Sequence, residues 1–212
     1  MNAKRRIDRY KESNPNELSE EQFRKLEHEI EYPKEEGISD EYFDFKLWCI
    51  DRPSRQEYFA NFLSKKLLKH QGAKILEVGG GRTGRLSRML AKKGFDMTCI
   101  DPKLEFEGNE IKCIREKFDY KKFDLTSYDY VIAQEPCEAT EHIVRACIAQ
   151  DIPFFIILCG TSHRLISGKK PKTAREWYEY LENIDNKKIK FRYISIYPVS
   201  RIPIIKSNKF WL

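Results

Sequence analysis

The sequence lacks any hydrophobic run as long as the roughly 20 residues needed to cross a bilayer. Its longest apolar run, residues 152–159, is typical of a buried strand. The N-terminal residues are charged and no apolar segment follows them, so a secretory signal is not expected. These absences predict a cytoplasmic protein with no membrane partner.

Cysteine pairs of the CxxC type, which are typical of zinc sites, are also missing. The six cysteines are isolated in the sequence, and four of them lie in or beside predicted strands, where a thiol packs as a small hydrophobic group. We therefore predict reduced thiols and no metal site. The cysteines are Cys49, Cys99, Cys113, Cys137, Cys147 and Cys159.

Charge of one sign does not dominate the chain, because 39 Lys and Arg residues against 33 Asp and Glu residues give a net charge of +6. Residues 164–212 are more basic, with 12 basic and 4 acidic residues. This excess favours a small-molecule or anionic substrate, such as a phosphate-bearing compound. Ordinary solvated lysines explain the same composition. A nucleic-acid partner is compatible with the charge, but no motif supports it.

The first 52 residues are polar and rich in Glu, Lys and Tyr. A helix is predicted from Ser19, where Ser19 and Gln22 form a capping box. The aromatic segment 42–50 carries too much apolar surface to stay free, so we expect it to form a lid or the arm of a homodimer. We therefore divide the chain into a helical N-terminal extension or lid, residues 1–52, and a main domain, residues 53–212.

Strand and helix patterns alternate in the main domain, after a helix that begins at Pro53 or Ser54. This alternation predicts an α/β fold with a doubly wound, mainly parallel, seven-stranded sheet. The predicted strands are 74–78, 96–100, 111–115, 128–133, 153–159, 189–197 and 202–206, and the later helices are 84–93, 138–149 and 173–184.

Glycines follow the first predicted strand at the spacing G-x-G-x-x-G, as Gly79, Gly81 and Gly84. Glycine lets the backbone bend sharply and lets a ligand approach it, and the next helix offers free N–H groups at its positive end. Asp101 ends the next strand, where a carboxylate can accept hydrogen bonds from ribose hydroxyls. The strand, turn, helix and acid together predict a nucleotide-type ligand.

Glu77 narrows the choice of ligand, because it lies two residues before the first glycine. A carboxylate there would repel the pyrophosphate of a nicotinamide dinucleotide. It would tolerate or attract a ligand with a cationic amino-acid end. Residues 75–81 and 99–102 resemble the first two motifs of class I S-adenosylmethionine-dependent methyltransferases, and the likeness covers roughly residues 55–206.

This resemblance implies a Rossmann-like fold of the methyltransferase type, with S-adenosylmethionine as the cofactor. In that family the glycine turn holds the methionine part, the acid matching Asp101 grips the ribose, and the residue matching Pro102 lies against the adenine. Phe118 or Asp119 would meet the adenine amine. The implied cofactor-binding residues are Glu77, Gly79, Gly80, Gly81, Gly84, Asp101, Pro102, Phe118, Asp119 and Gln134.

Two positions depart from the family pattern. Thr83 stands where family members commonly have another glycine, and residues 134–137 replace the Asn/Asp-Pro-Pro-aromatic signature after the fourth strand. Because the signature after the fourth strand is missing, the sequence does not predict the methyl acceptor.

The loops after the fourth and fifth strands should face the ligand and hold the catalytic candidates Glu135, Cys137 and His163. Glu135 or His163 can remove a proton from an acceptor. Cys137 follows a proline, as does the nucleophile of DNA cytosine methyltransferases, and a helix start lowers a thiol pKa. Structural explanations are a carboxylate at a helix N-terminus for Glu135 and an exposed loop residue for His163.

The sequence therefore favours a methyltransferase of unknown acceptor. Two alternatives remain. A degenerate methyltransferase-like binding protein would keep the sheet without catalysis, and an NAD(P)-binding oxidoreductase would use the same G-x-G-x-x-G spacing.

Overall fold

The structure is a computed structural model that describes residues 55–197 and 200–210. The helix predicted from Ser19, the aromatic segment 42–50 and the boundary at residues 52 and 53 lie outside the described residues and stay predictions. None of the helices in the described part of the chain has the length and apolar character that crossing a membrane requires.

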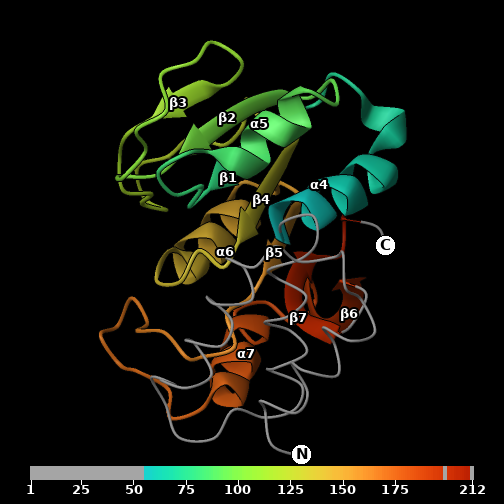
Figure 1. Ribbon diagram of the computed structural model, residues 1–212. Coiled ribbons are helices and arrows are strands. Elements are labelled where there is room, and N and C mark those ends of the chain that lie inside the picture. Colours follow the sequence, from blue (N-terminus) through green and yellow to red (C-terminus); the bar gives the residue numbers. More distant parts are fainter. Residues whose placement is uncertain (1–54, 198–199, 211–212) are drawn as a thin grey trace, which may run out of the picture. The chain divides into compact units, whose positions relative to one another are not determined.

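Seven strands form one sheet in the order β3-β2-β1-β4-β5-β7-β6 (Figure 1). Strands β1 to β5 pair in parallel, whereas β7 runs antiparallel to β5. The prediction of a mainly parallel, seven-stranded α/β sheet is confirmed. The strands are β1 Lys74–Val78, β2 Asp96–Ile100, β3 Lys112–Ile114, β4 Tyr130–Gln134, β5 Phe154–Ile157, β6 Ile189–Tyr197 and β7 Ser200–Ser207.

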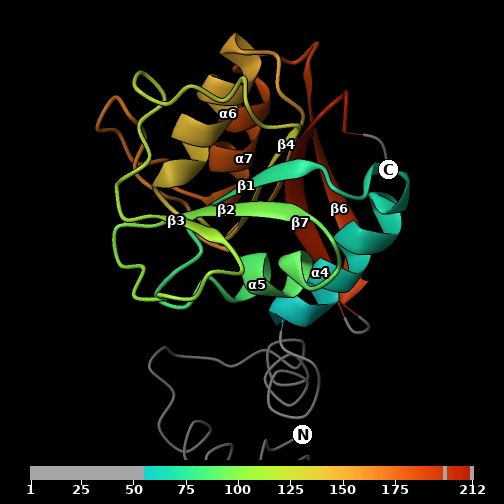
Figure 2. The same ribbon diagram turned by 90° about the horizontal axis from the view of Figure 1, so that it is seen from above.

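Helices cover both faces of the sheet (Figure 2). Two of them, α4 and α5, lie on one side, and α6 and α7 lie on the other. The helices are α4 Arg55–Lys66, α5 Arg85–Ala91, α6 Ala139–Ala149 and α7 Ala174–Glu182, and a short 3-10 helix, η1, spans Leu68–His70.

Neighbouring residues of β5 show why the sheet needs both layers. Successive side chains of a strand point to opposite faces. Phe155 packs against α4, with its ring 5.7 Å from that of Phe59 and 5.6 Å from that of Phe62. Phe154 belongs to the core cluster on the other face, together with Trp177 of α7. A continuous apolar run therefore indicated a strand that is buried on both faces.

Predicted element types are right in the described residues, but several boundaries are wrong. The helix expected over 84–93 spans Arg85–Ala91, because Gly84 has a positive φ of 54° and precedes the helix. Edge strand β3 is shorter than predicted. Thr173 caps α7 as expected, since its side chain accepts a hydrogen bond from the Glu176 N–H at 3.1 Å. In a capping box the Glu176 carboxylate would accept a hydrogen bond from the Thr173 N–H. Here it accepts one from the Lys172 N–H.

Two adjacent leucines at the end of α4 give a test of the packing. Leu67 is fully buried, whereas 66% of Leu68 is exposed. We expect L67A to lower the free energy of unfolding by about 2–5 kcal/mol, because it leaves a cavity in the core. The matched variant L68A should change it by less than about 0.5 kcal/mol. Urea denaturation measures both, and equal losses would contradict the described burial.

Candidate functional site

Residues 79–84 form the turn between β1 and α5, and all three glycines of the G-x-G-x-x-G spacing have positive φ. At Gly81, where φ is 66°, an added Cβ atom would meet nothing within 4 Å, so the turn is open at this point. At Gly80 an added Cβ atom would lie 2.3 Å from the Cys99 sulfur. The turn therefore packs directly onto β2 and has open space beside Gly81.

Asp101 connects this turn to the end of β2. One of its carboxylate oxygens accepts a hydrogen bond from the Gly81 N–H at 2.9 Å, and the other accepts from the Lys103 N–H at 2.7 Å. Each carboxylate oxygen can accept a further hydrogen bond, and Asp101 is only half-buried. The exposed ring of Pro102 lies next to it in the chain. The acid is thus held in place and can still bind ligand hydroxyls.

Glu77 has a structural role that the sequence reasoning missed. The side chain is 3% exposed, and its Oε2 atom accepts hydrogen bonds from the Ser87 N–H at 2.8 Å and the Ser87 hydroxyl at 2.5 Å. The first N–H groups of a helix have no partner within the helix. Gly84, which precedes α5, has no side chain to satisfy them, so Glu77 caps the helix from the neighbouring strand.

Burial raises the pKa of Glu77 to about 7, although the hydrogen bonds from Ser87 act in the opposite direction. This carboxyl group is therefore neutral in part of the population near neutral pH. Its expected direct contact with a ligand stays a prediction.

The two residues considered for the adenine amine differ in burial. Phe118 is 3% exposed and its ring stacks on that of Phe123 at 5.1 Å, so it serves the hydrophobic core. Asp119 is half-buried, and its carboxylate lies 3.8 Å from Nδ1 of His142. Of the pair, only Asp119 keeps a polar group that a ligand can reach.

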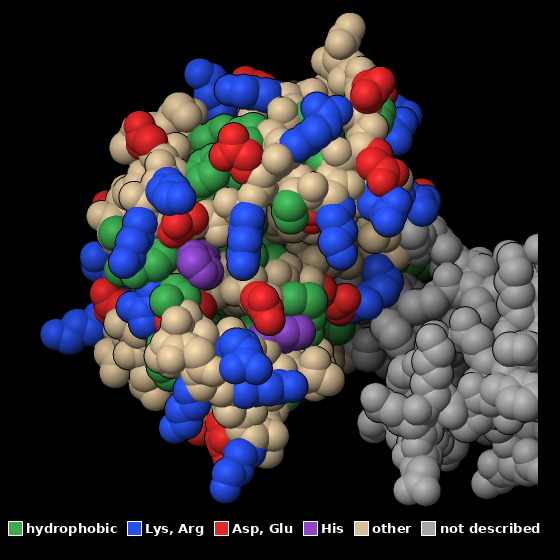
Figure 3. Space-filling model, turned by 90° about the vertical axis from the view of Figure 1, so that its left-hand side faces the viewer, with side chains coloured by type: hydrophobic (Ala, Val, Ile, Leu, Met, Phe, Trp, Pro, Cys, Tyr) green, Lys and Arg blue, Asp and Glu red, His purple; other side chains and the backbone are tan. Residues whose placement is uncertain are grey.

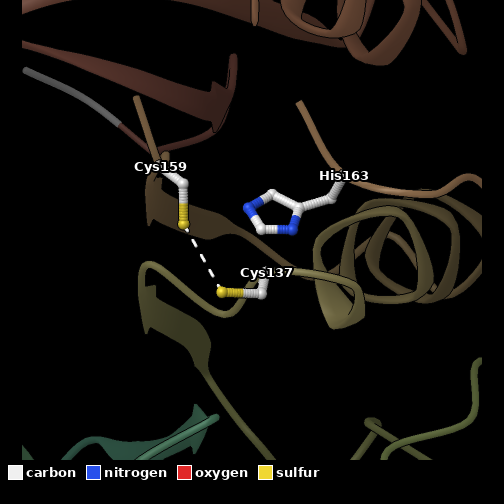
Figure 4. A group of neighbouring side chains, drawn as sticks. All are labelled: Cys137, Cys159 and His163. Carbon is white, nitrogen blue, oxygen red and sulfur yellow. Dashed lines mark hydrogen bonds between the residues drawn. The ribbon is translucent and has the colours of Figure 1, made fainter. Parts of the chain in front are cut away.

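The loops after β4 and β5 bring two cysteines together. The Cys137 and Cys159 sulfurs are 3.6 Å apart, and Figure 4 shows the His163 ring directed toward them. The ligand atoms of these three residues all lie within 4.8 Å of one another. Glu135 and Cys137 have positive φ values of 52° and 54°, which non-glycine residues rarely adopt, and strained residues of this kind tend to cluster at functional sites.

The contact between the sulfurs changes both thiols. A hydrogen bond from the Cys159 thiol lowers the pKa of Cys137 to about 7, against the opposing effect of burial. The same hydrogen bond, together with burial, raises the pKa of Cys159. The sequence argument expected a lower pKa of Cys137 from its position at a helix start. The hydrogen bond from Cys159 is a cause of the lower pKa that the sequence could not reveal.

His163 is not the exposed loop residue that its sequence context suggested. It is half-buried, and its ring lies edge-on to Trp177 at 5.1 Å. Burial lowers its pKa, so the imidazole is neutral at neutral pH. Its Nε2 atom is buried without a hydrogen-bond partner among the described residues.

The buried carboxylate of Glu141 in α6 anchors the loop that carries His163. One oxygen accepts hydrogen bonds from Arg145 Nε and the Tyr180 hydroxyl, both at 2.8 Å. The other accepts from the Ile166 N–H at 2.8 Å. Sequence reasoning missed this network, because a Glu in the first turn of a helix normally indicates an exposed face.

Surface charge on one face is mixed. Figure 3 shows Lys and Arg side chains interspersed with Asp and Glu across this view, without a continuous basic patch. This face therefore gives no support to a nucleic-acid partner, for which clustered basic residues are expected.

Comparisons with known proteins give matches among solved structures. No family model and no curated protein matches the sequence. The magnesium protoporphyrin IX methyltransferase of Synechocystis PCC 6803 with bound S-adenosylhomocysteine is 13% identical, over 98% of this chain and 99% of that chain, with a TM-score of 0.50. The chain thus has the Rossmann-like fold of class I S-adenosylmethionine-dependent methyltransferases.

Two further solved structures match at lower similarity. The 1,6-didemethyltoxoflavin-N1-methyltransferase of Burkholderia thailandensis is 15% identical, over 72% of this chain and 76% of that chain, with a TM-score of 0.45. A Galdieria sulphuraria protein assigned as a sarcosine dimethylglycine methyltransferase is 20% identical, with a TM-score of 0.40. This last match spans 49% of the present chain and 46% of the Galdieria chain.

The cap formed by Glu77 gives a pH-dependent prediction. A carboxyl group whose pKa rises from 4.5 to about 7 on folding favours the folded state when protonated, and this contribution is lost as the pH rises through 7. We expect the stability of the wild type relative to E77Q to fall by roughly 3 kcal/mol between about pH 5 and pH 8.

Urea denaturation at several pH values measures this difference. Glu107, an exposed acid, provides the matched control E107Q, whose stability should stay within about 0.5 kcal/mol of that of the wild type over the same range. A flat difference for E77Q as well would contradict the raised pKa.

Proposed function

We propose that this protein is an S-adenosylmethionine-dependent methyltransferase. The observation that carries the proposal is the hydrogen bond from the Gly81 N–H to Asp101. It joins an open glycine turn to a carboxylate that is placed to bind the hydroxyls of a ribose. Both lie at the carboxyl ends of parallel strands, where ligands of doubly wound sheets bind. The proposal also rests on the methyltransferase fold and on the S-adenosylhomocysteine bound in the magnesium protoporphyrin IX methyltransferase structure.

Sheet topology argues against the oxidoreductase alternative. Dinucleotide-binding domains have the parallel order β3-β2-β1-β4-β5-β6. Here β7 is inserted antiparallel between β5 and β6. Together with the carboxyl group of Glu77 beneath the turn, this topology favours a ligand without a pyrophosphate.

The proposed cofactor site follows the turn and the strand ends. Gly81 and its neighbours hold the methionine part, Asp101 binds the ribose, and Pro102 lies against the adenine. Asp119 approaches the adenine amine. The full set also contains Gly79, Gly80, Gly84, Gln134 and Glu77, the last through its support of the turn.

The proposed catalytic groups are Glu135, Cys137 and His163, on the loops after β4 and β5. Methyl transfer from a sulfonium is an in-line displacement, so the protein mainly has to align the acceptor and remove its proton when needed. The neutral imidazole of His163 and the Glu135 carboxylate suit proton removal. Turnover of any acceptor would distinguish an enzyme from a degenerate binding protein.

Calorimetric titration with S-adenosylhomocysteine tests the cofactor directly. We expect binding by the wild type and about 10- to 100-fold weaker binding by D101A, because hydrogen bonds to a charged acceptor are lost. Asp96, an exposed acid at the other end of β2, provides the control D96A, which should bind as the wild type does.

A parallel titration of the wild type with NAD⁺ addresses the dinucleotide alternative. The variant E77A would be a poorer test, because loss of the helix cap would confuse binding with folding. No binding of S-adenosylhomocysteine or S-adenosylmethionine by the folded wild type would refute the proposed function, and binding of NAD⁺ alone would favour an oxidoreductase.

A further inference from the structure

Three side chains that commonly bind metal ions, two thiols and an imidazole, meet where β4 and β5 end. Cys137 follows β4, Cys159 follows β5, and His163 lies on the loop that continues from β5. Their ligand atoms lie within 4.8 Å of one another, and the imidazole is directed toward both sulfurs (Figure 4). No fourth Asp, Glu, Cys or His of the described residues joins this group.

We propose that Cys137, Cys159 and His163 form a zinc-binding site. Zinc is held in proteins by thiolates at about 2.3 Å and by histidine nitrogens at about 2.0 Å, in tetrahedral geometry. Those bond lengths place two thiolates about 3.8 Å apart and a thiolate about 3.6 Å from the nitrogen. The two sulfurs are already 3.6 Å apart, and the widest of the three separations has to shorten by only about 1 Å.

The Nε2 atom of His163 supplies an independent observation. It is buried and has no hydrogen-bond partner among the described residues, which is unusual for a polar atom in a folded protein. The ring lies edge-on to Trp177, which restricts its orientation. A metal ion between the ring and the sulfurs would satisfy this nitrogen.

Both cysteines are also held through their backbone. The Cys137 carbonyl accepts a hydrogen bond from the Thr140 hydroxyl at 2.7 Å. The Cys159 carbonyl accepts one from the Tyr178 hydroxyl at 2.6 Å. Metal sites depend on such outer contacts, because they fix the ligands in position before the ion binds.

Three protein ligands would leave the fourth position of a tetrahedral zinc ion to water or to another ligand, as in catalytic zinc sites. The cluster lies at the carboxyl ends of the strands, where ligands of doubly wound sheets bind. A zinc ion there can activate a bound water or bind a thiol. Zinc binding is measured without the cofactor. A zinc-bound Nε2 atom of His163 can no longer accept a proton, so with zinc in place proton removal in the proposed methyl transfer would fall to Glu135.

The test uses the full chain, kept reduced with a phosphine and stripped of metal by dialysis. Zn²⁺ is titrated in competition with a chromophoric chelator, and Co²⁺ is used as a spectroscopic probe. We expect one high-affinity site and, with Co²⁺, thiolate charge-transfer bands together with the strong d–d bands of tetrahedral cobalt.

The variants C137S, C159S and H163Q should each weaken zinc binding by at least about tenfold, because even outer contacts of metal sites contribute this much. C113S, which changes a half-buried cysteine on β3 outside the cluster, should bind as the wild type does. Thermal unfolding curves confirm that each variant is folded.

Two results would overturn the proposal. One is a folded, reduced wild type that binds no stoichiometric zinc or gives no thiolate bands with Co²⁺. The other is unchanged affinity in the folded ligand variants. The wild-type zinc and cobalt measurements test the site without any variant, so the proposal can be refuted even if a variant does not fold. A negative result here together with binding of S-adenosylhomocysteine would leave the proposed function intact.

Discussion

The buried carboxyl group of Glu77 holds the glycine turn between β1 and α5 in place. It belongs to β1, yet it accepts two hydrogen bonds from Ser87 in α5 and so spans the glycine turn between them. Since the helix begins after a glycine, no local side chain can replace this contact. The turn, which packs against Cys99 through Gly80, is therefore fixed on one side by Glu77 and on the other by Asp101.

Parallel pairing explains why the candidate groups share one edge. Strands β1, β2, β4 and β5 all run in the same direction, so the residues that follow them lie at the same end of the sheet. The glycine turn and Asp101 occupy the part nearest β1 and β2. The Cys137, Cys159 and His163 cluster occupies the part nearest β4 and β5. A proposed cofactor site and a proposed metal site thus lie on one edge without sharing a residue.

Glu77 and Glu141 are the two buried acidic side chains of the described residues. Glu77 caps α5, and Glu141 fixes the loop that carries His163. Each of these carboxyl groups accepts hydrogen bonds from a backbone N–H of another segment, which stabilises the burial of a charged group. Both contacts hold loop conformations in place at the proposed site.

The sequence by itself determined the alternation of strands and helices, the glycine turn and the acid at the end of β2. These are local features, because apolar periodicity and the conformational needs of glycine act between near neighbours in the chain. Only the tertiary structure decided that Glu77 caps a helix, that Phe118 serves the core, and that two isolated cysteines meet beside a histidine. Cys137 and Cys159 are distant in sequence, so no CxxC spacing could reveal them. The pairing of β4 with β5 brings their sulfurs within 3.6 Å.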